Sequence, residues 1–288
     1  MSQERIILIG GPTASGKSAL AMQVARQVKG SIINTDAMQV YAGMPLLTAQ
    51  PDPKDRAEIP HLLYETTDAA EASSAGKWLA QAQAAIAQVW AAGRTPILVG
   101  GTGLYFEALR GGLTNIPNIP EDVRDAAEKL YTEQGEKTFR ATLAACDPAS
   151  AARIARNDRQ RLIRAYAVIA HTGKSLGDWH KEGSAASDYH DSEPETHLLL
   201  PPRDALYAAC DARFLSMIER GAIEEVKNLM SRNLSPSLPA MKVLGVREIA
   251  AYLRGETSLA DATAKAQQMT RNYAKRQMTW FRNRWKTP

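Results

Sequence analysis

The chain has 288 residues, 44% of them hydrophobic and 23% charged, an ordinary composition for a globular protein with one large α/β domain or two modest ones. No apolar run approaches the roughly 20 residues that a bilayer-spanning helix needs, and the N-terminus lacks the pattern of a signal peptide, so we expect a cytoplasmic protein with no membrane partner. The two cysteines, Cys146 and Cys210, lie far apart and outside any CxxC pattern, which argues against a structural disulfide or zinc site.

The net charge of +4 is mild, but the charges are unevenly distributed. Residues 262–288 contain seven Lys or Arg and no acid, and residues 153–164 contain five arginines and a single Asp. Such clusters indicate a polyanionic partner more strongly than the net charge does. A solvated basic face is the alternative for either cluster taken alone.

Short apolar runs alternate with helical patterns along much of the chain. In chain order they predict a strand at 5–9, a helix at 19–25, a strand at 31–34, an amphipathic helix at 78–92, a strand at 95–99 and a strand at 197–200. Strands that alternate with helices form a parallel sheet with helices on both faces. The predicted fold class is therefore α/β, with a P-loop NTPase-like parallel sheet flanked by helices.

The stretch 116–195 interrupts this alternation. It opens with a proline-rich connector, continues as helices with no convincing strand, and ends in a polar loop from 183 to 195. We expect an inserted all-helical domain at 116–195, with 1–115 and 196–288 forming the core. From residue 203 onward the chain is predicted to be helical, with a loop near Pro236 and Pro239.

A phosphate-binding loop follows the first predicted strand and opens the first helix. It matches the pattern G-x-x-x-x-G-K-[ST] with Gly11, Pro12, Thr13, Ala14, Ser15, Gly16, Lys17 and Ser18. Its glycines let backbone N–H groups point at phosphate oxygens, and the helix adds its positive end. Lys17 supplies a charge to the terminal phosphate, and the Ser18 hydroxyl is placed to bind Mg²⁺. The sequence therefore predicts a site for a di- or triphosphate group.

The acids near this loop differ from those of an ATPase or GTPase, in which an apolar strand ends in an Asp that holds Mg²⁺. Here the strand at 95–99 ends in Gly-Gly-Thr, and Asp36 is the acid at a strand end in the predicted crevice. That arrangement favours a transferase in which Asp36 binds or deprotonates the acceptor. An Asp after a strand is also often a helix N-cap, which is the alternative for Asp36. The glycine-rich segment 100–105 allows either close approach to a ligand or a tight turn.

Two basic segments are candidates for contact with a phosphate backbone. In the first, a helical stripe with an apolar opposite side is predicted for Arg153, Arg156, Gln160 and Arg164. The second, 270–285, interleaves basic and aromatic residues. It is predicted to pack Tyr273, Trp280 and Phe281 into the core and to present its charges to RNA, or to be a capping helix with a solubilising tail.

Together these patterns resemble one family. The segments that carry the resemblance are 11–18, 35–41 with 48–51, 61–63, 99–105, 157–165 with 172–174, 245–248 and 270–282. In this order they are similar to the motifs of the bacterial tRNA dimethylallyltransferases, also called tRNA isopentenyltransferases. Two positions depart from the family pattern: Ala167 stands where a Glu is usual, and Val246 where a Tyr is usual.

The resemblance implies a reaction and its residues. Dimethylallyl diphosphate would alkylate N6 of the adenosine 3′-adjacent to the anticodon of a tRNA and release pyrophosphate, and the P-loop would hold the donor's diphosphate. Asp36 would be the base, Thr13 and Lys17 would hold the diphosphate, and Ser18 would bind Mg²⁺. Thr102 would lie near the transferred group, and Arg213 would assist the departure of pyrophosphate. No obligate protein partner is evident.

The same resemblance assigns contacts with the anticodon stem-loop, which the helical insertion would grip. The tRNA-binding residues it implies are Asp36, Ala37, Met38, Gln39, Thr102, Arg124, Gln160, Arg161, Leu162, Ile163, Arg164, Lys242, Val243, Leu244, Gly245, Val246 and Arg247. Two other classes of protein would use the same loop. One is a nucleotide or small-molecule kinase, and the other is a P-loop RNA-binding module without catalysis, against which Asp36 and Arg213 argue.

Overall fold

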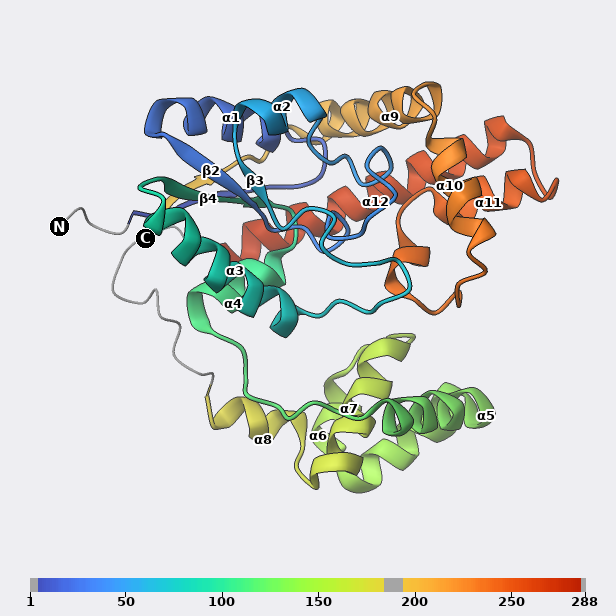
Figure 1. Cartoon of the computed structure of the whole chain (residues 1–288). Helices are drawn as coiled ribbons and strands as arrows, with labels where there is room; N and C mark the ends of the chain where they lie inside the picture. The colour runs from blue at the N-terminus through green and yellow to red at the C-terminus, as the bar shows by residue number, and fades with distance from the viewer. Residues whose placement is uncertain (1–4, 184–193, 286–288) are drawn as a thin grey trace. The chain divides into compact units, whose positions relative to one another are not determined.

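The computed structural model describes residues 5–183 and 194–285. The chain divides into two compact units, one of Met1–Arg110 with Asp188–Pro288 and one of Gly111–Ser187 (Figure 1). The sequence-based division, after residues 115 and 195, lies a few residues from these boundaries. No helix in the described part of the chain is long and apolar enough to span a membrane.

The first unit is built on a parallel five-stranded sheet with the order β3-β2-β4-β1-β5. Its strands are β1 (Ile7–Gly10), β2 (Gly30–Asn34), β3 (His61–Leu62), β4 (Thr95–Gly100) and β5 (Glu195–Leu198). The predicted parallel α/β sheet is thus confirmed. The two-residue strand β3 is too short to leave an alternating pattern in the sequence. The last strand begins at Glu195 rather than His197, because Glu195 pairs with Ile7 and its N–H donates to the Ile6 carbonyl at 3.0 Å.

Different helices cover the two faces of the sheet, because successive side chains of a strand point to opposite sides. Leu8 packs in a buried cluster with the apolar side of α3 (Ala75–Ala91), whereas Ile9 packs in a second cluster with α1 (Lys17–Val28). Figure 1 shows α1 and α3 on opposite faces of the sheet. The first helix starts at a left-handed Gly16 (φ 89°), and the Ser74 side chain caps α3 by accepting a hydrogen bond from the Lys77 N–H. Glycine and serine therefore set where these helices begin.

Two shorter helices and a run of C-terminal helices complete this unit. They are α2 (Pro53–Glu58), α4 (Gly103–Gly111), α9 (Arg203–Glu219), α10 (Ala222–Ser231), the 3₁₀ helix η1 (Pro239–Lys242), α11 (Val246–Leu253) and α12 (Leu259–Arg284). Helix α12 packs against α9 and α11. Its Phe281 is buried, its Trp280 is half-buried, and its Lys275 and Arg276 are exposed, which confirms the predicted separation of aromatic and basic residues.

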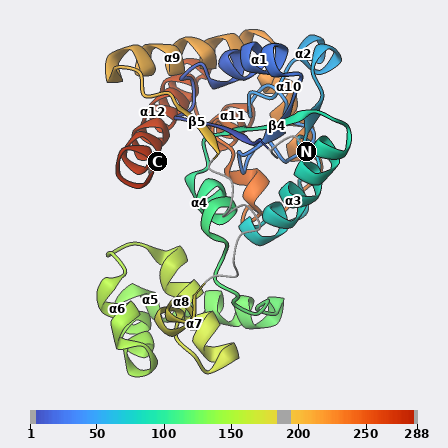
Figure 2. The ribbon, with the colours of Figure 1, turned by 90° about the vertical axis from the view of Figure 1, so that its left-hand side faces the viewer.

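The second unit is all-helical within its described residues, as expected for the insertion, and Figure 2 shows its helices gathered together. They are α5 (Glu121–Cys146), α6 (Pro148–Arg153), α7 (Arg159–Thr172) and α8 (Leu176–Lys181). Helix α5 is kinked at Gly135, where φ is 70°. A separate core forms here, with Phe139, Leu143 and Leu162 completely buried and Ala167 packed beside them. Alanine at position 167 is therefore a core residue.

The predicted stripe of Arg153, Arg156, Gln160 and Arg164 on one helix is wrong. Arg153 ends α6, Arg156 lies in the connecting turn, and α7 begins only at Arg159. The chain turns at Asn157, which is left-handed (φ 64°), and the Asp158 side chain then accepts from the Arg161 N–H as the cap of α7. An Asn–Asp pair favours such a turn and cap, and the spacing of the arginines conceals it.

Candidate active site

A cavity at the carboxyl ends of the strands brings the sequence-predicted residues together. It is lined by the P-loop from Thr13 to Ser18, by Asp36 after β2, by Gly100 at the end of β4 and by Arg213 of α9. Gln39, Thr48 and Tyr64 form further parts of its walls. The P-loop, Asp36 and Gly100 therefore line one cavity, as predicted, whereas residues 101–103 do not line it. Thr102 is joined to the same group by hydrogen bonds.

Lys17 carries an unusually easily lost proton. Its side chain is partly exposed to the cavity, yet the surrounding protein desolvates the ammonium and lowers its pKa to about 8. The carboxylate of Asp36 raises this pKa, and the guanidinium of Arg213 lowers it further. The Lys17 Nζ atom donates to the Pro12 carbonyl at 2.6 Å. An anion placed in the cavity would supply the negative charge that this ammonium lacks.

Arg213 contributes the second cation of the cavity. Its Nη2 atom donates a hydrogen bond to the hydroxyl of Thr13, so α9 and the P-loop are directly joined. Burial lowers the pKa of Arg213, although a guanidinium remains charged at any physiological pH. Two cations and the backbone amides of the loop thus surround a space suited to a diphosphate.

Asp36 sits in a turn and not at the start of a helix. Its N–H donates to the Asn34 side-chain oxygen at 2.8 Å, and its own Oδ1 atom accepts from the Met38 N–H at 2.9 Å. The buried Asn34 amide also donates to the carbonyls of Asp36 and Leu63, both at 3.0 Å. Within the described residues nothing donates to Oδ2 of Asp36, so this oxygen can accept from a ligand in the cavity.

Thr102 is fastened to the turn that carries Asp36. Its hydroxyl accepts from the Ala37 N–H at 3.0 Å, and its N–H donates to the Thr35 carbonyl at 3.2 Å. This close approach requires glycine at position 100, because a Cβ atom there would overlap the backbone of Thr35. The glycine-rich segment therefore allows close backbone packing between two strand ends, which places Thr102 beside the turn that carries Asp36.

An apolar cavity adjoins the cationic one. Thr13, Asp36, Thr48 and Arg213 line both. The other residues of the apolar cavity are Met38, Leu47, Cys210, Phe214, Met217, Val243, Leu244, Thr270 and Tyr273. Burial raises the pKa of Tyr273, whose side chain also interacts with Thr102. Leu47, Phe214 and Met217 have no motif in the sequence, since apolar residues at helical spacing are typical of any core.

Some residues of the segment 242–247 line the apolar cavity, and others are exposed on the surface. Val243 and Leu244 line the apolar cavity, and Lys242 and Arg247 are exposed. Val246 is only 1% exposed, so its side chain packs in the core and any contact with RNA from this position would come from the backbone. Only the two charged residues of this segment present a charge to a polyanion.

The second unit, described by itself, presents the other predicted RNA-binding residues. Arg161 is exposed, and burial together with the neighbouring Arg124 lowers the pKa of Arg164. Two guanidinium groups that repel each other in this way are suited to a shared anion. Leu162 and Ile163 are buried in the helical core, so they hold α7 in place and do not offer side chains to RNA.

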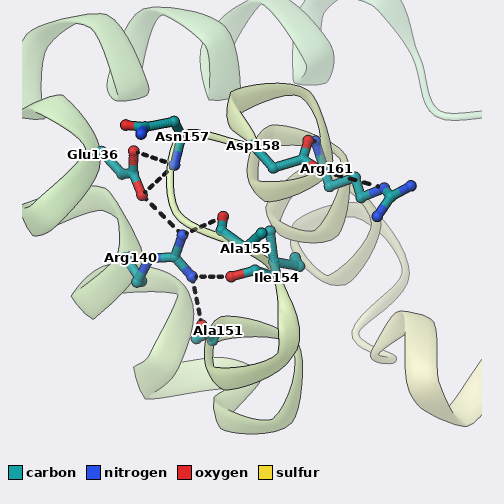
Figure 3. A network of polar contacts seen from close by, with 8 residues as sticks. All are labelled: Glu136, Arg140, Ala151, Ile154, Ala155, Asn157, Asp158 and Arg161. Atoms are coloured by element: carbon teal, nitrogen blue, oxygen red, sulfur yellow. Dashed lines mark hydrogen bonds and ion pairs between the residues drawn. The ribbon is translucent and has the colours of Figure 1, made fainter. Parts of the chain in front are cut away.

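A pair of charged residues on α5 fixes the turn that precedes α7 (Figure 3). Arg140 donates to the carbonyls of Ala151, Ile154 and Ala155 at 2.6, 2.7 and 2.9 Å. Glu136 bonds Arg140 at 2.9 Å and accepts from the Asn157 N–H at 2.9 and 3.0 Å. These bonds satisfy the carbonyls at the end of α6 and fix the approach to Arg159 and the first turn of α7.

Comparisons with known proteins identify the family of this chain. The family model described as IPP transferase matches residues 39–284. The chain is 53% identical to the tRNA dimethylallyltransferase of Caulobacter sp. (strain K31), covering 98% of this chain and 91% of that protein. The corresponding protein of Phenylobacterium zucineum is 52% identical, over 97% of this chain and 90% of its own length.

Solved structures of similar enzymes share the fold of this chain. The tRNA isopentenylpyrophosphate transferase of Bacillus halodurans is 33% identical with a TM-score of 0.66, over 98% of this chain and 88% of that one. A eukaryotic dimethylallyltransferase, captured acting on tRNA, is 28% identical with a TM-score of 0.79, over 97% of this chain and 70% of that one. The fold is thus shared across nearly the whole of this chain.

Proposed function

The chain belongs to the IPP transferase family and is an enzyme that transfers a dimethylallyl group to tRNA, and we propose that the transfer takes place in the cavity shared by the P-loop, Asp36 and Arg213. The acceptor is N6 of the adenosine 3′-adjacent to the anticodon, and the second product is pyrophosphate. The observation that carries this proposal is the junction of a cationic and an apolar cavity, which Thr13, Asp36 and Arg213 line together.

The cationic cavity binds the diphosphate of the donor. Backbone amides at positions 16–18 of the P-loop, the Lys17 ammonium and the Arg213 guanidinium neutralise the oxygens of the leaving group. This charge is most needed as the bond from carbon to oxygen breaks, when the diphosphate gains a further negative charge. The apolar cavity, with Leu47, Phe214 and others, receives the five-carbon chain.

Mg²⁺ fits the donor atoms of this cavity. Among the described residues there is no cluster of three or more His, Cys, Asp or Glu that would enclose an ion, and the Ser18 hydroxyl is the P-loop oxygen placed for one. Mg²⁺ characteristically takes few protein ligands and keeps phosphate oxygens and water as the others. Bound in this way, it would neutralise charge on the leaving diphosphate.

Asp36 acts as the general base. The lone pair of the adenine N6 attacks the carbon that bears the diphosphate, the bond from that carbon to oxygen breaks, and its electron pair leaves with pyrophosphate. The proton that N6 loses passes to the free Oδ2 of Asp36, whose Oδ1 is held by the Met38 N–H. The Thr102 hydroxyl accepts from the Ala37 N–H, so Thr102 lies beside the turn that carries this carboxylate.

The adenine has to leave its stack in the anticodon loop to reach the cavity. We assign the phosphate contacts that hold the loop to Lys242 and Arg247 in the first unit and to Arg124, Arg161 and Arg164 in the second. The enzyme would accordingly work in the cytoplasm, where tRNA is found.

A single assay tests the proposal. The protein is incubated with dimethylallyl diphosphate labelled in its prenyl group, an anticodon stem-loop RNA and Mg²⁺, in parallel with a reaction that contains labelled ATP. Label in the RNA and no consumption of ATP are expected. Consumption of ATP with unlabelled RNA would instead support a P-loop kinase, which the glycine-rich end of β4 disfavours because it offers no acid for Mg²⁺.

A further inference from the structure

Gln277 of α12 joins two loops of the active site through one side chain. Its Oε1 atom accepts a hydrogen bond from the Thr13 N–H at 2.8 Å, and its Nε2 atom donates to the Gly101 carbonyl at 2.9 Å. The side chain is buried, and 264 residues of chain separate Gln277 from Thr13. A backbone N–H can only donate and a carbonyl can only accept, so these partners fix the orientation of the amide.

Each end of this bridge lies next to a residue with a proposed role. Thr13 receives the hydrogen bond of Arg213 on its hydroxyl, and it lines both cavities. Gly101 directly precedes Thr102, which holds Ala37 beside Asp36. The amide of Gln277 therefore connects the side of the site that takes the leaving diphosphate with the side that takes the adenine.

The side chain of Gln277 packs directly against the turn at Gly101. A Cβ atom built on Gly101 would overlap the Nε2 atom of Gln277, so the turn and the side chain are in direct contact. A shorter or apolar side chain would leave a backbone N–H and a carbonyl without partners in the interior. An ionised glutamate would keep the acceptor for Thr13 and turn a second oxygen against the Gly101 carbonyl.

We propose that Gln277 is a positioning residue, which fixes the separation between the leaving-group loop around Thr13 and the acceptor turn at Gly101–Thr102. The inference rests on the proposed function. Since transfer requires the N6 atom and the donor carbon to meet in line, a small change in this separation lowers kcat far more than it weakens the binding of either substrate alone.

The test compares Gln277→Glu and Gln277→Leu with wild type between pH 6 and pH 8.5. A protonated glutamic acid presents one carbonyl oxygen and one O–H, the same acceptor and donor as glutamine, and burial beside a carbonyl favours this neutral form. The ratio of kcat for Gln277→Glu to kcat for wild type is therefore expected to rise about tenfold or more as the pH falls across this range. Gln277→Leu is expected to stay at least about tenfold below wild type at every pH, with a KM for the donor within about threefold.

Gln267→Glu is the matched control. Gln267 lies on the same helix, but its amide donates to the Asp211 carbonyl at 3.0 Å, outside both cavities. The ratio of kcat for Gln267→Glu to kcat for wild type is expected to be independent of pH. The midpoints of thermal unfolding of all variants, measured at each pH, show whether a loss of activity is a loss of folded protein.

The outcomes separate the two proposals. Failure of the wild type to label RNA overturns the proposed function. With an active wild type, a Gln277→Leu variant of normal kcat, or a Gln277→Glu ratio that does not change with pH, overturns the role of Gln277. A loss of activity that parallels a loss of folded protein in both variants also overturns it.

Discussion

The hydroxyl of Thr13 accepts a hydrogen bond from the guanidinium of Arg213, which lies 200 residues further along the chain. One residue of the P-loop is thereby held by α9 through its side chain and by α12 through its N–H. A glycine-rich loop at the N-terminus of a helix is by itself an anion-binding site. Here the C-terminal helices add a charge and a fixed geometry, which is what a transfer with a diphosphate leaving group needs.

If the Arg213 guanidinium stabilises the charge that develops on the leaving diphosphate, as proposed, Arg213→Ala is expected to lower kcat by about 10²–10³. Arg213→Lys restores part of the rate, since it keeps the charge without the planar hydrogen-bonding fork. Steady-state assays with the stem-loop RNA measure both. Arg220→Ala is the control: Arg220 caps the same helix and forms an exposed ion pair with Asp52, and its loss is expected to leave kcat unchanged.

Asp36→Asn is expected to reduce kcat by about 10²–10⁴ while RNA binding persists. The asparagine oxygen can still accept from the Met38 N–H, so the turn is kept and only the base is lost. Asp68→Asn is a close match, because Asp68 also accepts from the N–H two residues ahead, that of Ala70, but lies away from the cavities. Near-normal turnover in Asp36→Asn or in Asp36→Ala would show that Asp36 is not the base.

The binding of dimethylallyl diphosphate is expected to weaken as the pH rises above about 8. The pKa of Lys17 is lowered to about 8 in the free protein. A diphosphate bound beside this ammonium would raise its pKa again, because an opposite charge favours the protonated form. Below that pH Lys17 is protonated in both states and affinity is constant; above it, binding must take up a proton, so Kd rises by up to about tenfold per pH unit.

Calorimetric titrations in buffers of different ionisation enthalpy measure this proton uptake directly. Lys17→Met provides the comparison, with weaker binding at neutral pH and no proton uptake near pH 8. Equal proton uptake in the variant and the wild type would assign the effect to another group.

Arg140→Met is expected to destabilise the helical unit by about 1–3 kcal/mol, because it leaves the carbonyls of Ala151, Ile154 and Ala155 without this donor. The turn before α7 would then loosen, and affinity for the stem-loop RNA is expected to fall while KM for the donor stays the same. Thermal unfolding and RNA titrations measure the two effects. Lys129→Met on the same helix removes only an exposed pair with Glu133 and is expected to change neither.

The parts of the site that could be predicted are those whose chemistry is encoded locally. The P-loop is formed by neighbouring residues that make one turn. Asp36 follows β2 and Gly100 ends β4, and both strands have clear apolar patterns. Their meeting at one end of the sheet follows from parallel topology alone. The roles of these residues in catalysis remain predictions that the variants above would test.

Other parts depend on contacts between distant segments and leave no local signal. Gln277 looks like any glutamine on a charged helix until α12 is placed beside Thr13. Leu47 and Phe214 line a cavity and both pack against the left-handed Gly245, a contact between segments that are distant in the sequence. The prediction of one arginine stripe was wrong because a local signal was overlooked. The spacing of the arginines fits a helix, but Asn157 and Asp158 turn the chain before α7 starts.

The amide bridge of Gln277 also bears on how the protein is made. The P-loop is synthesised early, yet its Thr13 acquires its two fixed partners only after residues 213 and 277 have been added. A nascent chain that ends before residue 213 therefore lacks the Arg213 guanidinium beside Thr13, and one that ends before residue 277 lacks the bridge between Thr13 and Gly101. The fixed geometry of the loop is accordingly complete only once α12 has docked.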